Sequence, residues 1–165
     1  MVEKPSEGFR VFEQGNLQKV LVIGIGNEYR SDDGIGLVIV RKIRERLLLS
    51  VTVKEESGEG AALMEAWQGY ESVILVDAVS SDVKPGTIFK INAGKKNVPA
   101  KFFRYSTHAF SMAEAIELAR AMNTLPPKLF IYGIEGANFS AGVGISHAVQ
   151  EAANRVVGQI LKKIL

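Results

Sequence analysis

The stretch KVLVIGIGNEYRSDDGIG, residues 19–36, decides the fold of this 165-residue chain. Residues 19–25 form a continuous, largely β-branched apolar run that ends in a glycine-rich turn, as is typical of a strand covered on both faces. A helix is predicted to follow from about residue 33 to residue 48. A strand, a tight turn and a helix in this order form the first unit of an α/β fold.

The rest of the chain continues this alternation. Strands are predicted at residues 51–57, 72–79, 87–92 and 128–135, the third of them antiparallel to the others. Helices are predicted at residues 61–68, 109–122 and 145–164, and a loop at residues 93–106. The pattern indicates a three-layer α/β/α sandwich with a mostly parallel central sheet of about five strands.

Length and composition fit one soluble domain. Apolar residues make up 47% of the chain and charged residues 23%, which is ordinary for a globular protein. Residues 1–18 are expected to form a polar N-terminal extension, and residues 19–165 a single domain.

Cysteine content, hydropathy and charge exclude several classes of protein. Without cysteine there is neither a disulfide scaffold nor a thiolate nucleophile. No apolar run approaches the roughly 20 residues of a membrane span. The net charge is +2, and the basic cluster at residues 41–46 is interpreted as the solvated side of a helix. We therefore expect a cytoplasmic protein that binds neither nucleic acid nor membrane.

The glycine-rich turn partly matches a dinucleotide-binding motif. Gly24 and Gly26 correspond to the first two glycines of G-x-G-x-x-G, but position 29 is Tyr29, and loss of the third glycine weakens close packing of the helix on the strand. A nucleotide-binding α/β protein stays open as an alternative, with Glu55 or Glu56 as the acid that binds the ribose.

Two adjacent aspartates argue against a phosphate in this turn. Asp32 and Asp33 would lie at the helix N-terminus, where a phosphate normally binds. One contact between like charges at about 4 Å costs on the order of 4 kcal/mol at an effective dielectric near 20. The two aspartates could also simply cap the helix.

Further acids and one histidine are predicted at the same edge of the sheet. Asp77 and Glu135 end two predicted strands, and His108 precedes a predicted helix. Ligands of open α/β sheets bind at the carboxyl ends of the strands. One carboxylate of the acidic pair, together with Asp77 and His108, would form a set of two oxygens and one nitrogen that suits a divalent cation such as zinc or nickel.

The quoted stretch resembles the N-terminal signature of the hydrogenase maturation endopeptidases, which is G-x-G-N followed by an acidic pair and G-x-G. VILVDAV, with Asp77, resembles the second acidic segment of that family. STHAFSMAEAIELA, with His108, and KLFIYGIE are similar to its later segments. The resemblance runs from about Lys19 to Leu165 and preserves the order of the motifs.

The resemblance implies a nickel-dependent endopeptidase that removes the C-terminal extension from the precursor of a [NiFe] hydrogenase large subunit. Asp33, Asp77 and His108 correspond to its catalytic, metal-contacting residues, and Asp32 would cap the helix or support them. The bound precursor would supply the nickel, with zinc or cadmium able to replace it, and the protease would be a monomer. The resemblance leaves open whether nickel activates water or only anchors the substrate.

Two further expectations complete this interpretation. Gly58 and Gly60 are expected to keep the floor of the cleft open for a peptide. A nickel-binding checkpoint or chaperone module with the same ligands and no catalysis is a second alternative to the protease.

Overall fold

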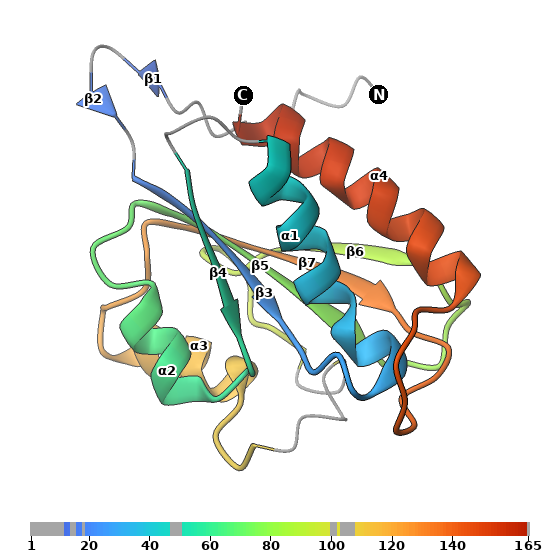
Figure 1. The fold of residues 1–165 in the computed structure, drawn as a ribbon. Coiled ribbons are helices and arrows are strands. Elements are labelled where there is room, and N and C mark those ends of the chain that lie inside the picture. The colour runs from blue at the N-terminus through green and yellow to red at the C-terminus, as the bar shows by residue number, and fades with distance from the viewer. Residues whose placement is uncertain are drawn as a thin grey trace, which may run out of the picture.

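The computed structural model describes residues 12–13, 16–17, 19–46, 51–99, 102 and 108–164 (Figure 1). Its main sheet has five strands in the order β4-β3-β5-β7-β6. The strands are β3 (Val20–Ile25), β4 (Val51–Glu56), β5 (Ser72–Val79), β6 (Ile88–Asn92) and β7 (Lys128–Glu135). Strands β4, β3, β5 and β7 are parallel, and β6 is antiparallel to β7, which confirms the predicted mostly parallel sheet.

Helices cover both faces of the sheet and make three layers (Figure 1). One face carries α1 (Ile35–Arg46) and α4 (His147–Ile164), and the other carries α2 (Gly60–Ala66) and α3 (Met112–Ala121). Among the described residues, no helix is long and apolar enough to cross a membrane.

Strand β3 shows why the sheet lies between two layers. All of its residues are buried, and successive side chains point to opposite faces. Val20 and Val22 join the core under α1 and α4, whereas Leu21 and Ile23 join the core under α2 and α3. A continuous apolar run is therefore the expected sequence for a strand with a helix layer on each side.

Two predicted helix starts differ from the observed ones. A short 3-10 helix, η1 (Ser31–Gly34), takes up the acidic pair, so α1 begins at Ile35 instead of residue 33. Helix α3 begins at Met112 instead of residue 109, because the Glu114 carboxylate accepts a hydrogen bond from the Ser111 amide and fixes the first turn there. The predicted end of the first helix, at residues 47–48, lies outside the described residues.

Two of the predicted irregular segments are described only in part. Within the predicted extension, β1 (Phe12–Glu13) and β2 (Asn16–Leu17) form an antiparallel pair. The other residues of 1–18, and most of the second half of the predicted 93–106 loop, lie outside the described residues.

The order of the strands marks where a ligand should bind. From β3 the chain passes through α1 to β4 on one side, then returns through α2 to β5 on the other side of β3. The strand order therefore reverses between β3 and β5. In open α/β sheets, the crevice outside the carboxyl ends of two such strands is the usual binding site.

Candidate active site

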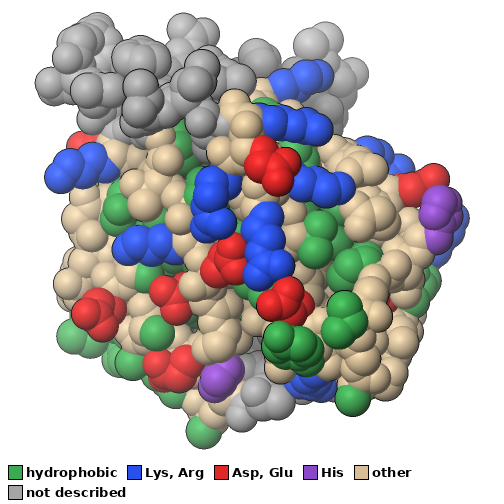
Figure 2. Space-filling view, viewed as in Figure 1, with side chains coloured by type: hydrophobic (Ala, Val, Ile, Leu, Met, Phe, Trp, Pro, Cys, Tyr) green, Lys and Arg blue, Asp and Glu red, His purple; other side chains and the backbone are tan. Residues whose placement is uncertain are grey.

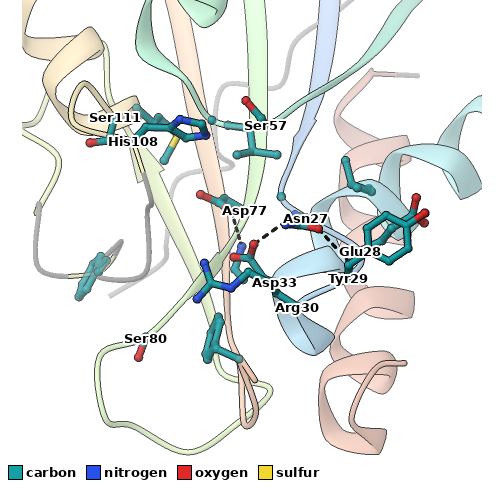
Figure 3. Close-up of a pocket in the computed structure, with 18 residues that line it drawn as sticks. Asn27, Glu28, Tyr29, Arg30, Asp33, Ser57, Asp77, Ser80, His108 and Ser111 are labelled. Carbon is teal, nitrogen blue, oxygen red and sulfur yellow. Dashed lines mark hydrogen bonds between the residues drawn. The ribbon is translucent and has the colours of Figure 1, made fainter. Parts of the chain in front are cut away.

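A cavity of about 360 Å³ opens at this point of reversal. Its walls include Asn27 and Arg30 from the turn after β3, Asp33 from η1, Asp77 from β5 and His108 from the segment before α3 (Figure 3). The structure thus places all three predicted site residues at one pocket.

Close packing of α1 against the sheet brings η1 to the strand ends. A Cβ atom on Gly36 would lie 2.3 Å from the carbonyl oxygen of Ile25 and 2.4 Å from that of Val76, so only glycine fits there. In the dinucleotide-binding motif, the third glycine allows the helix to pack closely on the strand. In this chain the corresponding position is occupied by Tyr29. Gly36 provides that packing instead.

Asp32 is a structural residue that points away from the pocket. Its side chain is 0% exposed and accepts hydrogen bonds from Ala137 N at 2.8 Å, Asn138 N at 2.9 Å, Ser146 N at 2.7 Å and Ser146 Oγ at 2.8 Å. Burial alone would raise its pKa, but these hydrogen bonds together lower it. Asp32 therefore does not cap its own helix and instead fixes the loop that leads into α4.

Asp33 points into the pocket. One of its carboxylate oxygens accepts a hydrogen bond from Asn27 N at 3.1 Å. Burial raises the pKa of Asp33, and the Arg30 charge and the Asn27 hydrogen bond offset this only in part. The Asp33 carboxylate thus lies where its negative charge is poorly compensated.

Asp77 is compensated even less. It accepts a hydrogen bond from the adjacent Ala78 amide at 2.8 Å. Burial, and next the charge of Asp33, raise the pKa of Asp77 well above its usual value. Figure 3 shows Asp33 and Asp77 facing each other across the middle of the site. Two such carboxylates favour either a shared proton or a bound cation.

His108 lies on another wall of the same pocket. A Cβ atom on Gly58 would be 3.9 Å from His108 Cδ2, and the charge of His108 adds to two backbone hydrogen bonds in lowering the pKa of Glu59. Among the described residues, no group of three or more His, Cys, Asp or Glu side chains is arranged to hold a metal ion. The structure therefore pairs Asp33 with Asp77 and places His108 on another wall of the same pocket.

The two glycines predicted to form the cleft floor have different roles. Gly58 lines the pocket, as predicted. Gly60 is outside the lining, and a Cβ atom on it would lie 2.6 Å from the Phe110 ring. Gly60 therefore allows α2 to pack against Phe110, and the prediction for it was wrong.

Two acids expected at the sheet edge are engaged in other contacts. The Glu135 carboxylate accepts hydrogen bonds from Ser81 N and Ser81 Oγ, each at 2.8 Å. Glu55 forms ion pairs with Arg41 at 2.9 Å and Arg44 at 3.1 Å, so its carboxylate is already bound and does not match the acid that a ribose needs.

Sequence reasoning missed Arg30. Its side chain lies beside Asp33 in Figure 3, and its charge lowers the pKa of that carboxyl. Arg30 lies two residues before the Asp32–Asp33 pair in the sequence, and a basic residue so close to two acids could have been predicted to contact one of them.

Comparison with known proteins supports both the fold and the family resemblance. The family model described as "Hydrogenase maturation protease" matches residues 37–163, a range that contains Asp77 and His108 and begins just after Asp33. The chain is 26% identical over 147 residues to the "Hydrogenase 2 maturation protease" of Escherichia coli strain K12, covering 87% of this chain and 88% of that protein.

Two solved structures have the same fold. One is the hydrogenase maturating endopeptidase HybD from E. coli, with a TM-score of 0.76 and 23% identity over 88% of this chain and 91% of that one. The other is the [NiFe] hydrogenase maturation protease HycI from Thermococcus kodakarensis KOD1, with a TM-score of 0.67 and 20% identity over 89% and 92% of the two chains. These likenesses confirm the predicted α/β architecture.

Proposed function

The chain belongs to the hydrogenase maturation protease family, whose members are hydrolases, and we propose that it removes the C-terminal extension from the precursor of a [NiFe] hydrogenase large subunit after nickel has been inserted. The observation that carries this proposal is the Asp33–Asp77 pair in the pocket between β3 and β5. Two under-compensated carboxylates form a site that a cation would stabilise.

Nickel enters this proposal as part of the substrate. The carboxylates of Asp33 and Asp77 and the imidazole of His108 offer oxygen and nitrogen donors of the kind that nickel and zinc accept. Because the three side chains are not grouped into a metal site of their own, the precursor would bring the metal already held by its own ligands. Docking would then neutralise the acidic pair and position the scissile peptide bond beside it.

The reaction is hydrolysis of one peptide bond. A water adds to the scissile carbonyl, and its proton moves to the leaving amide nitrogen as the carbon–nitrogen bond breaks. A carboxylate with a raised pKa is suited to carry that proton, because a general base works best when its pKa lies near the operating pH. Asp77, with its strongly raised pKa, is the proposed proton carrier, and Asp33 and His108 would position the metal.

Incubation with nickel-loaded and nickel-free precursor from the same organism tests this function. Mass spectrometry should detect loss of a C-terminal segment from the loaded form alone. Asp77→Asn should abolish the cleavage, whereas Glu71→Gln, just before the opposite end of β5, should leave it unchanged. Failure of the wild-type protein to shorten either form would overturn the protease assignment.

The same experiment separates the protease from a non-catalytic nickel module. Such a module would bind the nickel-loaded precursor and leave its mass unchanged. Because the module has the same three ligands, Asp77→Asn should weaken its binding of the nickel-loaded precursor, again without any change in mass.

A further inference from the structure

Two large exposed apolar side chains, Tyr29 and Val143, lie on neighbouring segments, and Tyr29 lines the pocket. The strongly exposed large apolar residues among the described part of the chain are Tyr29, Val83, Leu118, Met122 and Val143. Tyr29 is 67% exposed and lines the pocket, and Val143 is the most exposed of the set at 81%. Neither belongs to either core cluster, so packing of the fold does not explain them.

Backbone hydrogen bonds join the segments that carry these two side chains. Gly142 N donates to Tyr29 O at 2.9 Å, and Ser31 N donates to Gly142 O at 2.9 Å. Arg30 and Gly142 thereby form an isolated parallel bridge. Tyr29 and Val143 each adjoin this bridge in sequence, so the segment that carries Val143 is joined to the Tyr29 wall of the pocket.

Phe139 connects this wall to the interior. It lines the pocket and packs against the core beneath α1 and α4. We call Tyr29, Phe139 and Val143 the apolar rim. On the face shown in Figure 2, hydrophobic side chains reach the surface next to the start of α1.

The rim is held in place despite its exposure. Asp32, buried beneath it, binds the 137–146 loop through the hydrogen bonds described above, and Ser31 Oγ donates to Ser140 O at 2.9 Å. Tyr29 N donates to Asn27 Oδ1 at 2.9 Å and fixes the other side. An exposed loop that is fixed before binding loses little conformational entropy when a partner docks.

We propose that the apolar rim binds an apolar side chain of the precursor next to the scissile bond. This inference rests on the proposed function. Tyr29 and Phe139 line the same pocket as Asp33 and Asp77, so a peptide with its scissile bond at those carboxylates can lie against these two rim side chains. Tyrosine is among the residues that most often contribute binding energy when a partner covers them.

Serine substitutions at the rim test the inference. Tyr29→Ser with Val143→Ser should raise KM for the nickel-loaded precursor roughly tenfold, as expected for loss of an apolar anchor, and should change kcat by less than about twofold. Val143→Ile, which keeps the apolar surface, should retain the wild-type KM. Leu118→Ser with Met122→Ser, on α3 and its C-terminal cap and outside the pocket lining, is the matched control and should leave KM unchanged.

The outcomes separate this inference from the proposed function. If the wild-type protein cleaves the precursor and the rim variant has the same KM as the α3 control, the rim inference is wrong and the protease assignment stands. If the wild-type protein cleaves nothing, both fail. Melting temperatures of all variants should match, because the substituted side chains are exposed.

Changes in the precursor give a second readout. Apolar residues flanking the cleavage site are replaced singly by serine and assayed with the wild-type and the rim variant. At one position of the precursor, the serine replacement should raise the KM of the wild-type protein but change the KM of the rim variant little. This result is expected when the replaced residue contacts the rim directly. Additive effects at every position would overturn the inference.

Discussion

Asp32 accepts four hydrogen bonds from the loop before α4, whereas Asp33 faces the pocket and accepts one from Asn27. The two residues are adjacent in sequence, yet the pKa of Asp32 is lowered and that of Asp33 is raised. The pKa of Asp77 is also raised, and by more than that of Asp33. The carboxylate on the loop side of η1 therefore accepts four hydrogen bonds, whereas Asp33 and Asp77, which face the pocket, accept one each.

This difference separates stability from activity. A carboxylate whose folded pKa is lowered stabilises the fold above its unfolded pKa, and the contribution is lost as the pH falls through the folded pKa. A carboxylate whose folded pKa is raised contributes stability below its unfolded pKa, which is lost as the pH rises toward the folded pKa. At neutral pH Asp32 should stabilise the protein, and Asp33 and Asp77 should destabilise it.

The largest expected effect is loss of cleavage on the pocket side. Asp33→Asn or Asp77→Asn should lower the rate of precursor processing by about 1,000-fold or more, equivalent to about 4 kcal/mol of transition-state stabilisation. Asp33→Asn removes a negative charge that the proposed nickel contact needs, and Asp77→Asn removes the proposed proton carrier. Single-turnover cleavage with excess enzyme measures the effect. Near-normal rates in both variants would contradict the claim that the carboxylates facing the pocket act in cleavage.

Replacement of Asp32 should mainly affect folding. Asp32→Ala leaves the amides of Ala137, Asn138 and Ser146 without their partner in a buried position. Each buried donor left without a partner typically costs about 1–3 kcal/mol. Urea denaturation should show a correspondingly lower midpoint, and addition of the precursor should partly restore stability by mass action. A midpoint close to that of the wild-type protein would show that the loop does not depend on Asp32.

The family resemblance separated Asp33, as the metal-contacting residue, from Asp32, but the hydrogen-bond partners of Asp32 could not be predicted from the sequence. The order of strands and helices follows from local apolar runs, so the five-stranded sheet and its antiparallel edge strand were predicted. The partners of Asp32 lie more than 100 residues away, in a loop with no helical or strand pattern. Gly60 was misassigned for the same reason, because its contact with Phe110 joins α2 to the start of α3.

Replacement of Asp77 should have a smaller effect on stability than replacement of Asp32, and it should stabilise the protein instead of destabilising it. Asp77→Asn should raise the free energy of unfolding at pH 7 by about 1 kcal/mol, the usual size for a stabilising substitution. The gain should shrink as the pH falls toward about 4, where the carboxyl is protonated in the unfolded chain as well. Urea denaturation at several pH values gives this profile. A gain that stayed constant with pH would mean that ionisation of Asp77 is not its source.

The smallest effect should come from carboxylates that are paired at the surface. Basic and acidic side chains are interspersed over α1 and β4 in Figure 2, and there Glu55 pairs with Arg41 and Arg44, whose side chains are 41% and 50% exposed. Water and salt screen such pairs, so Glu55→Gln should lower the free energy of unfolding by no more than about 1 kcal/mol. The difference should fall further in 1 M NaCl, where the Debye length is about 3 Å, whereas the effect of Asp32→Ala should persist because Asp32 is buried. Equal salt sensitivity in the two variants would mean that burial does not explain why Asp32 matters more than Glu55.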